Sequence, residues 1–336
     1  TVGALVMNGT SPSITNSTGT SSLTVSGTAT LANAITTSGT QTYTGAVTLS
    51  AATTLTGSTI TTNGTLAGGT NSLTITGNAV FGDGTTDTVT GVNVLSVSGN
   101  TTIHTNTITT TGTQTYGDTA ASDTITLGNG TTLTTTNAQV TFNGTVNAEA
   151  SEANALTLSV GTSEVEFNGA VGGGASGSLG AISITGALDL NAAITSASSL
   201  SVSTTSDLGA NVTTSGTQTY TGAVTLSAAT TLTTTSNTIT FSSTVNSDAT
   251  TRNLTFGAGS GNAVFTGAVG NSAALGTITN IAGQTLTFSD AVTATTIANY
   301  GTLLFNANSA KTISPAITDN GTTTIDRKST RLNSSH

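Results

Sequence analysis

Apolar side chains alternate with small polar ones in many short stretches of this chain. Leu23–Val25 reads Leu-Thr-Val, Ser72–Thr76 reads Ser-Leu-Thr-Ile-Thr and Asn237–Phe241 reads Asn-Thr-Ile-Thr-Phe. A period of two is typical of strands that bury one face. Turn-like segments rich in Gly and Asn separate these stretches, since both residues tolerate the positive φ of tight turns. No window has a useful apolar period of 3.6 residues, so the pattern predicts an all-β fold with almost no helix.

The alternating segments recur as copies along the chain. The stretch Thr36–Thr56 is identical to Thr213–Thr233, and a third, partly diverged copy begins at Thr110. Super-repeats therefore start near residues 39, 112 and 216, and the first of them is shortened to 73 residues. Repeats of this kind indicate a stacked array in which each unit contacts its neighbours.

Two all-β architectures use short strands and tight turns. An array of β-sandwich domains is the alternative, but the repeats contain no linker-like break and the strands do not group into sevens. The small side chains favour a parallel β-solenoid, which we predict for residues 1–326 in roughly 16 turns of about 20 residues. Aromatic residues at repeated positions predict stacked ladders. They are Tyr43, Tyr116, Tyr220, Phe142, Phe167, Phe241 and Phe265.

The alternation also assigns individual side chains to the inside or the outside. We expect Val47, Leu49, Val224 and Leu226 to point inward. We expect Gly45, Gly169, Gly222 and Gly267 to be essential in turns. Replacing Val224 by Asp should disrupt folding, whereas Thr225→Asp should be tolerated.

Charge is sparse and acidic in this chain. The net charge is −9, and only 6% of the residues are charged. Three of the five basic residues, Arg327, Lys328 and Arg331, lie in the last ten. Binding to nucleic acid or to an anionic membrane requires a basic patch, so this composition speaks against both partners. No run of about 18 apolar residues occurs, so no helical membrane insertion is expected. The chain has no cysteine, as is ordinary for exported bacterial proteins.

Both ends of the sequence suggest a fragment. The chain starts at Thr1 with no apolar signal segment. Composition changes abruptly after Asp326, and Arg327–His336 resembles adapter read-through at the end of an assembled reading frame. We therefore expect residues 327–336 to be a non-native or disordered tail.

The repeats have a family resemblance. Segments such as Gly-Thr-Gln-Thr-Tyr-Thr-Gly-Ala-Val-Thr-Leu at Gly39 and Phe-Asn-Gly-Ala-Val-Gly at Phe167 resemble the repeats of filamentous haemagglutinin-like and autotransporter adhesins of Gram-negative bacteria. The resemblance covers most of residues 20–320 and implies a right-handed parallel β-helix on the outer cell surface. It implies a stalk that acts in adhesion to host or neighbouring cells, in aggregation or in the biofilm matrix. It matches no catalytic residue of any kind.

Paired carboxylates are the strongest catalytic candidates, because some β-solenoids cleave polysaccharides. Glu164 and Glu166 are two apart on one predicted strand and should face the same side. Two further pairs, Asp83 with Asp87 and Glu149 with Glu152, lie in turn-like stretches. Glycoside hydrolysis also needs a groove, usually with sugar-stacking aromatics, and the chain has no Trp. We interpret these carboxylates as solvated charge and expect no enzyme activity.

Other reactive residues are isolated along the sequence. His104 alternates with Ile103, which places it outside the core, and no nucleophile-base pattern accompanies it. The run Gly172–Gly174 precedes no helix, as phosphate binding would require, and is interpreted as a turn. The Asp residues follow no calcium-binding period. We therefore predict no catalytic, cofactor or metal site.

Ice binding is an alternative function, as is polysaccharide binding. The segments Thr42–Thr44, Thr74–Thr76, Thr107–Thr109 and Thr285–Thr287 have the Thr-x-Thr form of flat ice-binding faces. Thr also occurs in turns and on both sides of many strand residues, so the sequence shows no single row of Thr that recurs in every turn. The simpler interpretation is that stacked Thr and Asn ladders hold the turns together.

Overall fold

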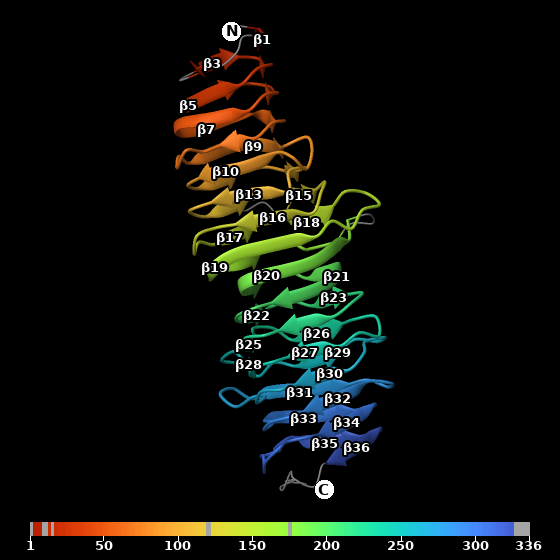
Figure 1. The fold of residues 1–336 in the computed structure, drawn as a ribbon. Helices are drawn as coiled ribbons and strands as arrows, with labels where there is room; N and C mark the ends of the chain where they lie inside the picture. Colours follow the sequence, from red (N-terminus) through yellow and green to blue (C-terminus); the bar gives the residue numbers. More distant parts are fainter. Residues whose placement is uncertain (1–2, 9–12, 15–16, 119–121, 174–176, 326–336) are drawn as a thin grey trace. The chain divides into compact units, whose positions relative to one another are not determined.

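The computed structural model describes residues 3–8, 13–14, 17–118, 122–173 and 177–325 (Figure 1). These residues form a parallel β-solenoid of about 15 turns and contain no helix, which confirms the predicted fold class. The chain divides into two compact units, Thr1–Gly180 (unit 1) and Ala181–His336 (unit 2). The expected tail at 327–336 lies outside the described residues.

Unit 1 is built from strands of two to sixteen residues. They are β1 (Leu5–Met7), β2 (Ser13–Ile14), β3 (Ser17–Thr20), β4 (Leu23–Val25), β5 (Ala29–Thr37), β6 (Gln41–Tyr43), β7 (Val47–Thr62), β8 (Leu66–Ala67), β9 (Leu73–Phe81), β10 (Thr88–Val92), β11 (Leu95–Val97), β12 (Thr101–Ile103), β13 (Thr107–Thr110), β14 (Gln114–Tyr116), β15 (Thr124–Leu127), β16 (Thr131–Thr134), β17 (Val140–Phe142), β18 (Thr145–Ala148) and β19 (Leu156–Phe167).

Unit 2 continues the same pattern, and β20 (Leu179–Leu190) begins just before it in the chain. Its strands are β21 (Ile194–Val202), β22 (Ser206–Leu208), β23 (Val212–Thr214), β24 (Gln218–Tyr220), β25 (Val224–Leu226), β26 (Thr230–Thr233), β27 (Ile239–Phe241), β28 (Val245–Ser247), β29 (Leu254–Phe256), β30 (Ala263–Phe265), β31 (Leu275–Asn280), β32 (Thr285–Phe288), β33 (Ala294–Asn299), β34 (Thr302–Phe305), β35 (Ala316–Asp319) and β36 (Thr322–Ile325).

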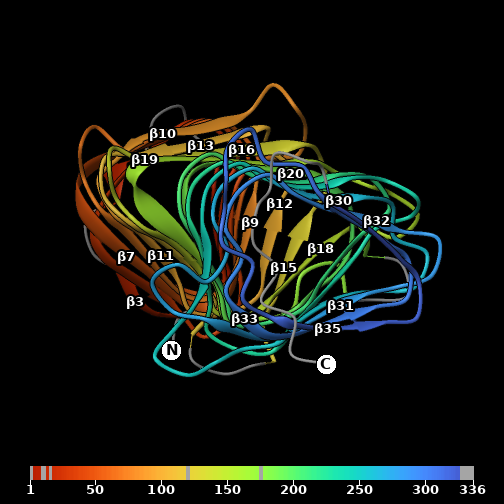
Figure 2. The ribbon, with the colours of Figure 1, turned by 90° about the horizontal axis from the view of Figure 1, so that it is seen from below.

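Each turn of unit 1 has three strand segments, and each segment pairs in parallel with its equivalent in the next turn. The result is three walls around a core (Figure 2). Wall A contains β4, β6, β12, β15 and β18, wall B contains β10, β13 and β16, and wall C contains β11, β14 and β17. The long strands β5, β9 and β19 bend from one wall to the next and contribute to two walls each, and β7 contributes to all three.

Alternation along the strands fills the core with aliphatic and aromatic side chains. The predicted inward residues Val47, Leu49, Val224 and Leu226 are at most 2% exposed, which confirms the assignment. Burial of a side chain of this size stabilises a fold by about 1.5–3 kcal/mol.

Stacked aromatic rings run through the core of each unit. In unit 1, Tyr116 stacks on Phe142 and Phe142 on Phe167, with ring centroids 5.4 and 5.0 Å apart. In unit 2, five rings stack at centroid distances of 4.6 to 5.6 Å. They are Tyr220, Phe241, Phe265, Phe288 and Phe305. These distances are close to the spacing of neighbouring strands, so one ring per turn produces the predicted ladders. The prediction was wrong for Tyr43, because its partners in the adjacent turns are Val25 and Thr62, which are not aromatic.

The Gly-Thr-Gln-Thr-Tyr segment builds the same local structure wherever it occurs. The hydroxyl of Tyr116 donates to Gln114 Oε1 at 2.9 Å, and Gln114 Nε2 donates to the Thr134 carbonyl of the next turn at 3.0 Å. Tyr43 with Gln41 and Tyr220 with Gln218 repeat this arrangement. Burial raises the pKa of all three tyrosine hydroxyls, so they serve the core as neutral donors.

The four predicted turn glycines are needed for a different reason from the one expected. Their φ angles lie outside the left-handed region, so conformational freedom does not explain them. A Cβ at Gly169 or Gly222 would lie 2.1 or 2.2 Å from a backbone oxygen of the preceding turn. At Gly45 and Gly267 the closest backbone atom would be at 2.6 and 2.5 Å. Close approach of successive turns therefore excludes any side chain here.

Candidate functional site

The two glutamates of β19 lie on the outside of wall C, as predicted. Glu164 is exposed and Glu166 half-buried, while Val165 between them is buried. Gln139 Nε2 donates to both carboxylates, at 3.1 Å to Glu164 and 3.2 Å to Glu166. Thr141 Oγ1 also donates to Glu166 at 3.3 Å. Both carboxylates are thus engaged by neighbouring polar groups on an open wall.

His104 is brought to a carboxylate that the sequence did not connect with it. Its Nε2 lies 2.9 Å from Glu149 Oε1, and the two side chains are 32% and 41% exposed. The prediction that His104 points away from the core is confirmed, but the ion-pair geometry was missed. The partner predicted for Glu149, Glu152, instead accepts a hydrogen bond from Asn154 Nδ2 at 2.6 Å. The first contact joins loops that are two turns apart, whereas the second lies within one loop.

The remaining sequence candidates lie in turns. The backbone N–H of Asp83 donates to Asp87 Oδ2 at 3.3 Å, which closes a short loop. Gly172 has a φ of 71°, as expected for a turn, and Gly174 lies outside the described residues. Over the described ranges, no group of three or more His, Cys, Asp or Glu side chains could hold a metal ion.

Both basic side chains of the described residues are paired with an aspartate. Arg252 Nε and Nη2 donate to the two carboxylate oxygens of Asp248 at 2.9 and 2.7 Å. These hydrogen bonds lower the pKa of Asp248 to about 2. Lys311 Nζ lies 2.9 Å from Asp290 Oδ1. Neither cation therefore contributes to a basic patch.

Two aspartates that the sequence analysis did not single out are adjacent in register. Asp189 of β20 pairs with Asp207 of β22, and Thr225 of β25 follows them on the same outer face. One oxygen of Asp207, Oδ1, has no hydrogen-bond partner. The sequence spacing could have revealed this pair, because one turn of 18 residues separates the two aspartates.

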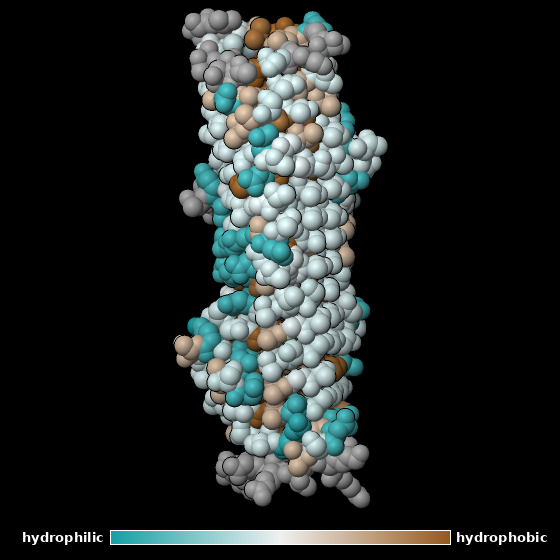
Figure 3. All heavy atoms as spheres, turned by 60° about the vertical axis from the view of Figure 1, so that its left-hand side comes forward, coloured by the Kyte–Doolittle hydropathy of each residue, from teal (hydrophilic) through white to brown (hydrophobic). Residues whose placement is uncertain are grey.

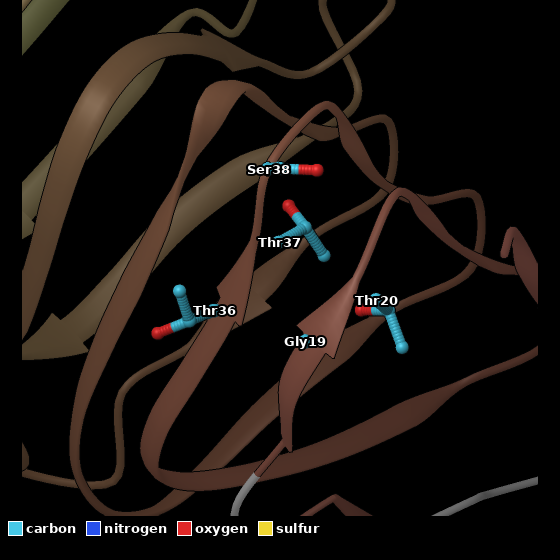
Figure 4. Close-up of a pocket in the computed structure, with 5 residues that line it drawn as sticks. All are labelled: Gly19, Thr20, Thr36, Thr37 and Ser38. Carbon is cyan, nitrogen blue, oxygen red and sulfur yellow. The ribbon is translucent and has the colours of Figure 1, made fainter. Parts of the chain in front are cut away.

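A small hollow of about 190 Å³ occurs in unit 1 between β3 and β5 (Figure 4). Gly19 and Thr20 lie on one side of it and Thr36, Thr37 and Ser38 on the other. Thr37 Oγ1 donates to the Gly39 carbonyl at 2.8 Å. The lining contains hydroxyl and backbone groups and no acid, base or thiol that would support catalysis.

Buried amides form a short ladder near the end of unit 2. Asn280 Nδ2 donates to Asn299 Oδ1 at 2.7 Å, and Asn299 Nδ2 donates to Asp319 Oδ1 at 2.8 Å. Each side chain therefore bonds to the equivalent side chain of the following turn. This is the role that was predicted for stacked polar residues.

The outer surface of wall B carries two regular rows of hydroxyl groups. The first row consists of Thr88, Thr107, Thr132 and Thr157, which are in register across β10, β13, β16 and β19. The second row consists of Thr109, Thr134 and Ser159, in register across β13, β16 and β19. We call these seven residues the threonine face. No such row recurs in every turn, as the sequence interpretation held, but these two rows are regular over four and three turns.

Hydroxyl groups on the two sides of wall B differ in their bonding. The inward Thr110 and Thr131 donate to the backbone carbonyls of Gly112 and Thr105, at 2.6 and 3.2 Å. By contrast, no hydroxyl of the threonine face bonds to another group of the described residues. All seven side chains are half-buried by their neighbours. Their hydroxyls are therefore held in place by packing and left to bond with water.

Near-neutral residues such as Thr and Ser dominate the molecular face drawn in Figure 3, where white spheres outnumber teal and brown ones. No helix long and apolar enough to cross a membrane occurs in the described residues. Comparisons with known protein families, with curated proteins and with solved structures find no match to this chain.

Proposed function

We propose that this chain is a stalk segment of a secreted bacterial surface adhesin, exported to the outer surface of a Gram-negative cell. The observation that carries the proposal is the Gly-Thr-Gln-Thr-Tyr segment, which makes the same buried hydrogen bonds in three places. A segment that rebuilds one local structure adds turns to a solenoid, and added turns give length. The resemblance of the repeats to adhesin repeats supports the same function.

The outer surface suits a weakly adhesive spacer. Hydroxyl and amide groups dominate it, and the two basic residues of the described part are neutralised by aspartates. The partners that fit this surface are other cell surfaces, the biofilm matrix or further copies of the chain. Nucleic acid does not fit, because an acidic chain repels phosphate. No enzymatic role is proposed.

Length is the property to test first. The segment 206–223 corresponds to one turn, because Ser206 pairs with Val224 in the next turn. Inserting five further copies of this segment should lengthen the particle by about 24 Å, at about 4.8 Å per turn, in small-angle scattering. An insert of the same composition in shuffled order is the control and should form a loop. No lengthening by the ordered insert would refute the stalk.

Adhesion is tested separately on beads coated with the full chain. Such beads should attach to cultured cell layers or biofilm, or should clump together, more than beads coated with a globular protein of equal mass. Attachment and clumping no greater than this control would refute the adhesive part of the proposal and would leave the length measurement unaffected.

A further inference from the structure

The threonine face is a periodic array of hydroxyl groups, and a stalk does not require it. From its geometry we infer that this face of unit 1 binds ice, with the surface layer of the crystal as its ligand. The inference goes beyond the proposed stalk function and does not depend on it.

The spacing of the face follows from strand geometry. Within each row, successive hydroxyls such as those of Thr107 and Thr132 lie in neighbouring parallel strands, about 4.8 Å apart. Between the rows, Thr132 and Thr134 are two residues apart on one strand, a separation of about 6.7 Å. Both repeats are close to distances between oxygen atoms in the lattice of hexagonal ice. A crystal surface can therefore meet several hydroxyls of the face at once.

Regular pairing keeps this array periodic. The pairs of β13 with β16 and of β16 with β19 run through without a register shift. The shift between Val89 and Val92 of β10 ends the second row, because a bulge moves the chain out of register there. The regular array therefore covers three complete strands and the first-row position of a fourth.

The hydroxyls are preorganised for ordered water. Six of the seven residues are threonines, whose β-branched side chains have restricted χ1 freedom, and their neighbours half-bury them. None of the seven hydroxyls is occupied by a protein partner. Binding to a rigid array costs little conformational entropy. Each contact with ice is weak, but contacts made together by one face add up as in multivalent binding.

Charge is absent from the face itself. A charged side chain would hold a hydration shell that does not fit a crystal lattice, and none occurs in either row. Wall C carries a longer outer column of hydroxyls, from Thr54 to Thr141, but the charged Glu166 ends it. Wall A also carries outward threonines, but Val80 and Asn147 interrupt its column. The threonine face carries both of its hydroxyl rows, without a charge, on the three consecutive strands β13, β16 and β19.

The test compares two substitutions of matched environment in the full chain. Thr132→Tyr places a ring in the centre of the first row, between Thr107 and Thr157. Thr102→Tyr is the control, since Thr102 is also half-buried and outward, but on wall A between Val80 and Thr126. Thermal hysteresis and inhibition of ice recrystallisation are measured for both variants and the unaltered chain, with circular dichroism melting to verify folding.

The unaltered chain should give thermal hysteresis above that of serum albumin at the same concentration. Thr132→Tyr should lower the hysteresis to less than half, while Thr102→Tyr leaves it unchanged and both variants melt like the unaltered chain. Hysteresis no greater than that of albumin would overturn the inference, as would equal loss in both variants. If Thr132→Tyr fails to fold, Thr134→Lys supplies the same test with a charge in the second row. Bead attachment by Thr132→Tyr should be unaffected, which separates ice binding from adhesion.

Discussion

Replacing Val224 by Asp tests whether the solenoid interior is as dry and tightly packed as the strand register implies. Val224 is 1% exposed at the start of β25. It lies between Ser206 of the preceding turn and Val245 of the following turn. Both neighbours belong to the core, since Ser206 is 2% exposed and Val245 fully buried. A carboxylate at this position has no cation to pair with.

The cost of the substitution has two parts. Loss of the buried valine removes about 1.5–3 kcal/mol. A buried carboxyl has a pKa raised by about 3–5 units, so at pH 7 it takes up a proton, and this limits the ionisation cost to about 3 units, or about 4 kcal/mol. The sum is about 6–7 kcal/mol. The Ser206 hydroxyl, which has no hydrogen-bond partner, could donate to the new carboxyl and brings the value toward the lower end.

The control for this experiment follows from the register of the outer face. Thr225 is next in the chain, half-buried and outward. However, it pairs with Asp207, which in turn pairs with Asp189, so Thr225→Asp would create a row of three carboxylates. Like charges directly opposite each other on a sheet cost up to about 1 kcal/mol. The structure therefore modifies the tolerance predicted from sequence, and Thr225→Asn is the better control.

Urea unfolding monitored by limited proteolysis distinguishes these cases. At pH 7, Val224→Asp should open the turns around β25 and be cut there, because each turn is stabilised chiefly by its neighbours. Thr225→Asn should resist cleavage like the unaltered chain, and Thr225→Asp should fall between them. A folded-state pKa above the unfolded value means that the ionisation part of the penalty grows above about pH 4 and vanishes below it, while the loss of valine packing remains. Equal cleavage of Val224→Asp and Thr225→Asn at pH 7, or no recovery of Val224→Asp near pH 4, would refute the reasoning.

Three further predictions concern other contacts. Gly222→Ala should lower the melting temperature strongly, because the new Cβ would lie 2.2 Å from the Thr204 carbonyl oxygen. Gly84→Ala should leave the melting temperature unchanged, because no atom lies within 4 Å of a Cβ there. Equal melting temperatures would contradict the close approach of turns. Tyr220→Phe should destabilise unit 2 by about 1–3 kcal/mol in urea melts, because Gln218 Oε1 loses its buried donor, while Tyr300→Phe at the surface serves as a control with no effect. Arg252→Gln should raise the pKa of Asp248 from about 2 toward 3.8 in a carboxyl NMR titration. In the unaltered chain, the contribution of Asp248 to stability is present above pH 4 and is lost between about pH 4 and pH 2. An unchanged titration in the variant would contradict the assigned ion pair.

Much of the fold follows from alternation alone. The period of two predicted that Val224 and Leu226 are buried, and aromatic residues at equivalent repeat positions, such as Phe142 and Phe241, predicted aromatic ladders. However, residues at equivalent repeat positions do not stack on each other. Phe142 stacks on Tyr116 and Phe167, one turn away on either side, while Phe241 lies in the ladder of unit 2. Sequence similarity reveals equivalent positions, whereas contact depends on the number of residues in each turn.

Turn length explains what the sequence analysis missed. In the first row of the threonine face the offset is 19 residues from Thr88 to Thr107 and 25 from Thr107 to Thr132. A search at one fixed period cannot align these threonines, although they are in register in space. The pairing of His104 with Glu149 was missed for the same reason, since 45 residues and two turns of unequal length separate them. Loops absorb the differences without disturbing the walls.

The Gly-Thr-Gln-Thr-Tyr segment occupies two different walls within unit 1. Gln41 and Tyr43 belong to β6 in wall A, whereas Gln114 and Tyr116 belong to β14 in wall C, and both pairs make the same hydrogen bonds. Walls A and C are thus interchangeable for this segment. A gene that encodes such a protein can gain or lose one strand and its turn by unequal recombination and still encode a closed coil. Its length can therefore change in steps of one strand, provided that each inserted strand keeps the alternation of inward and outward residues.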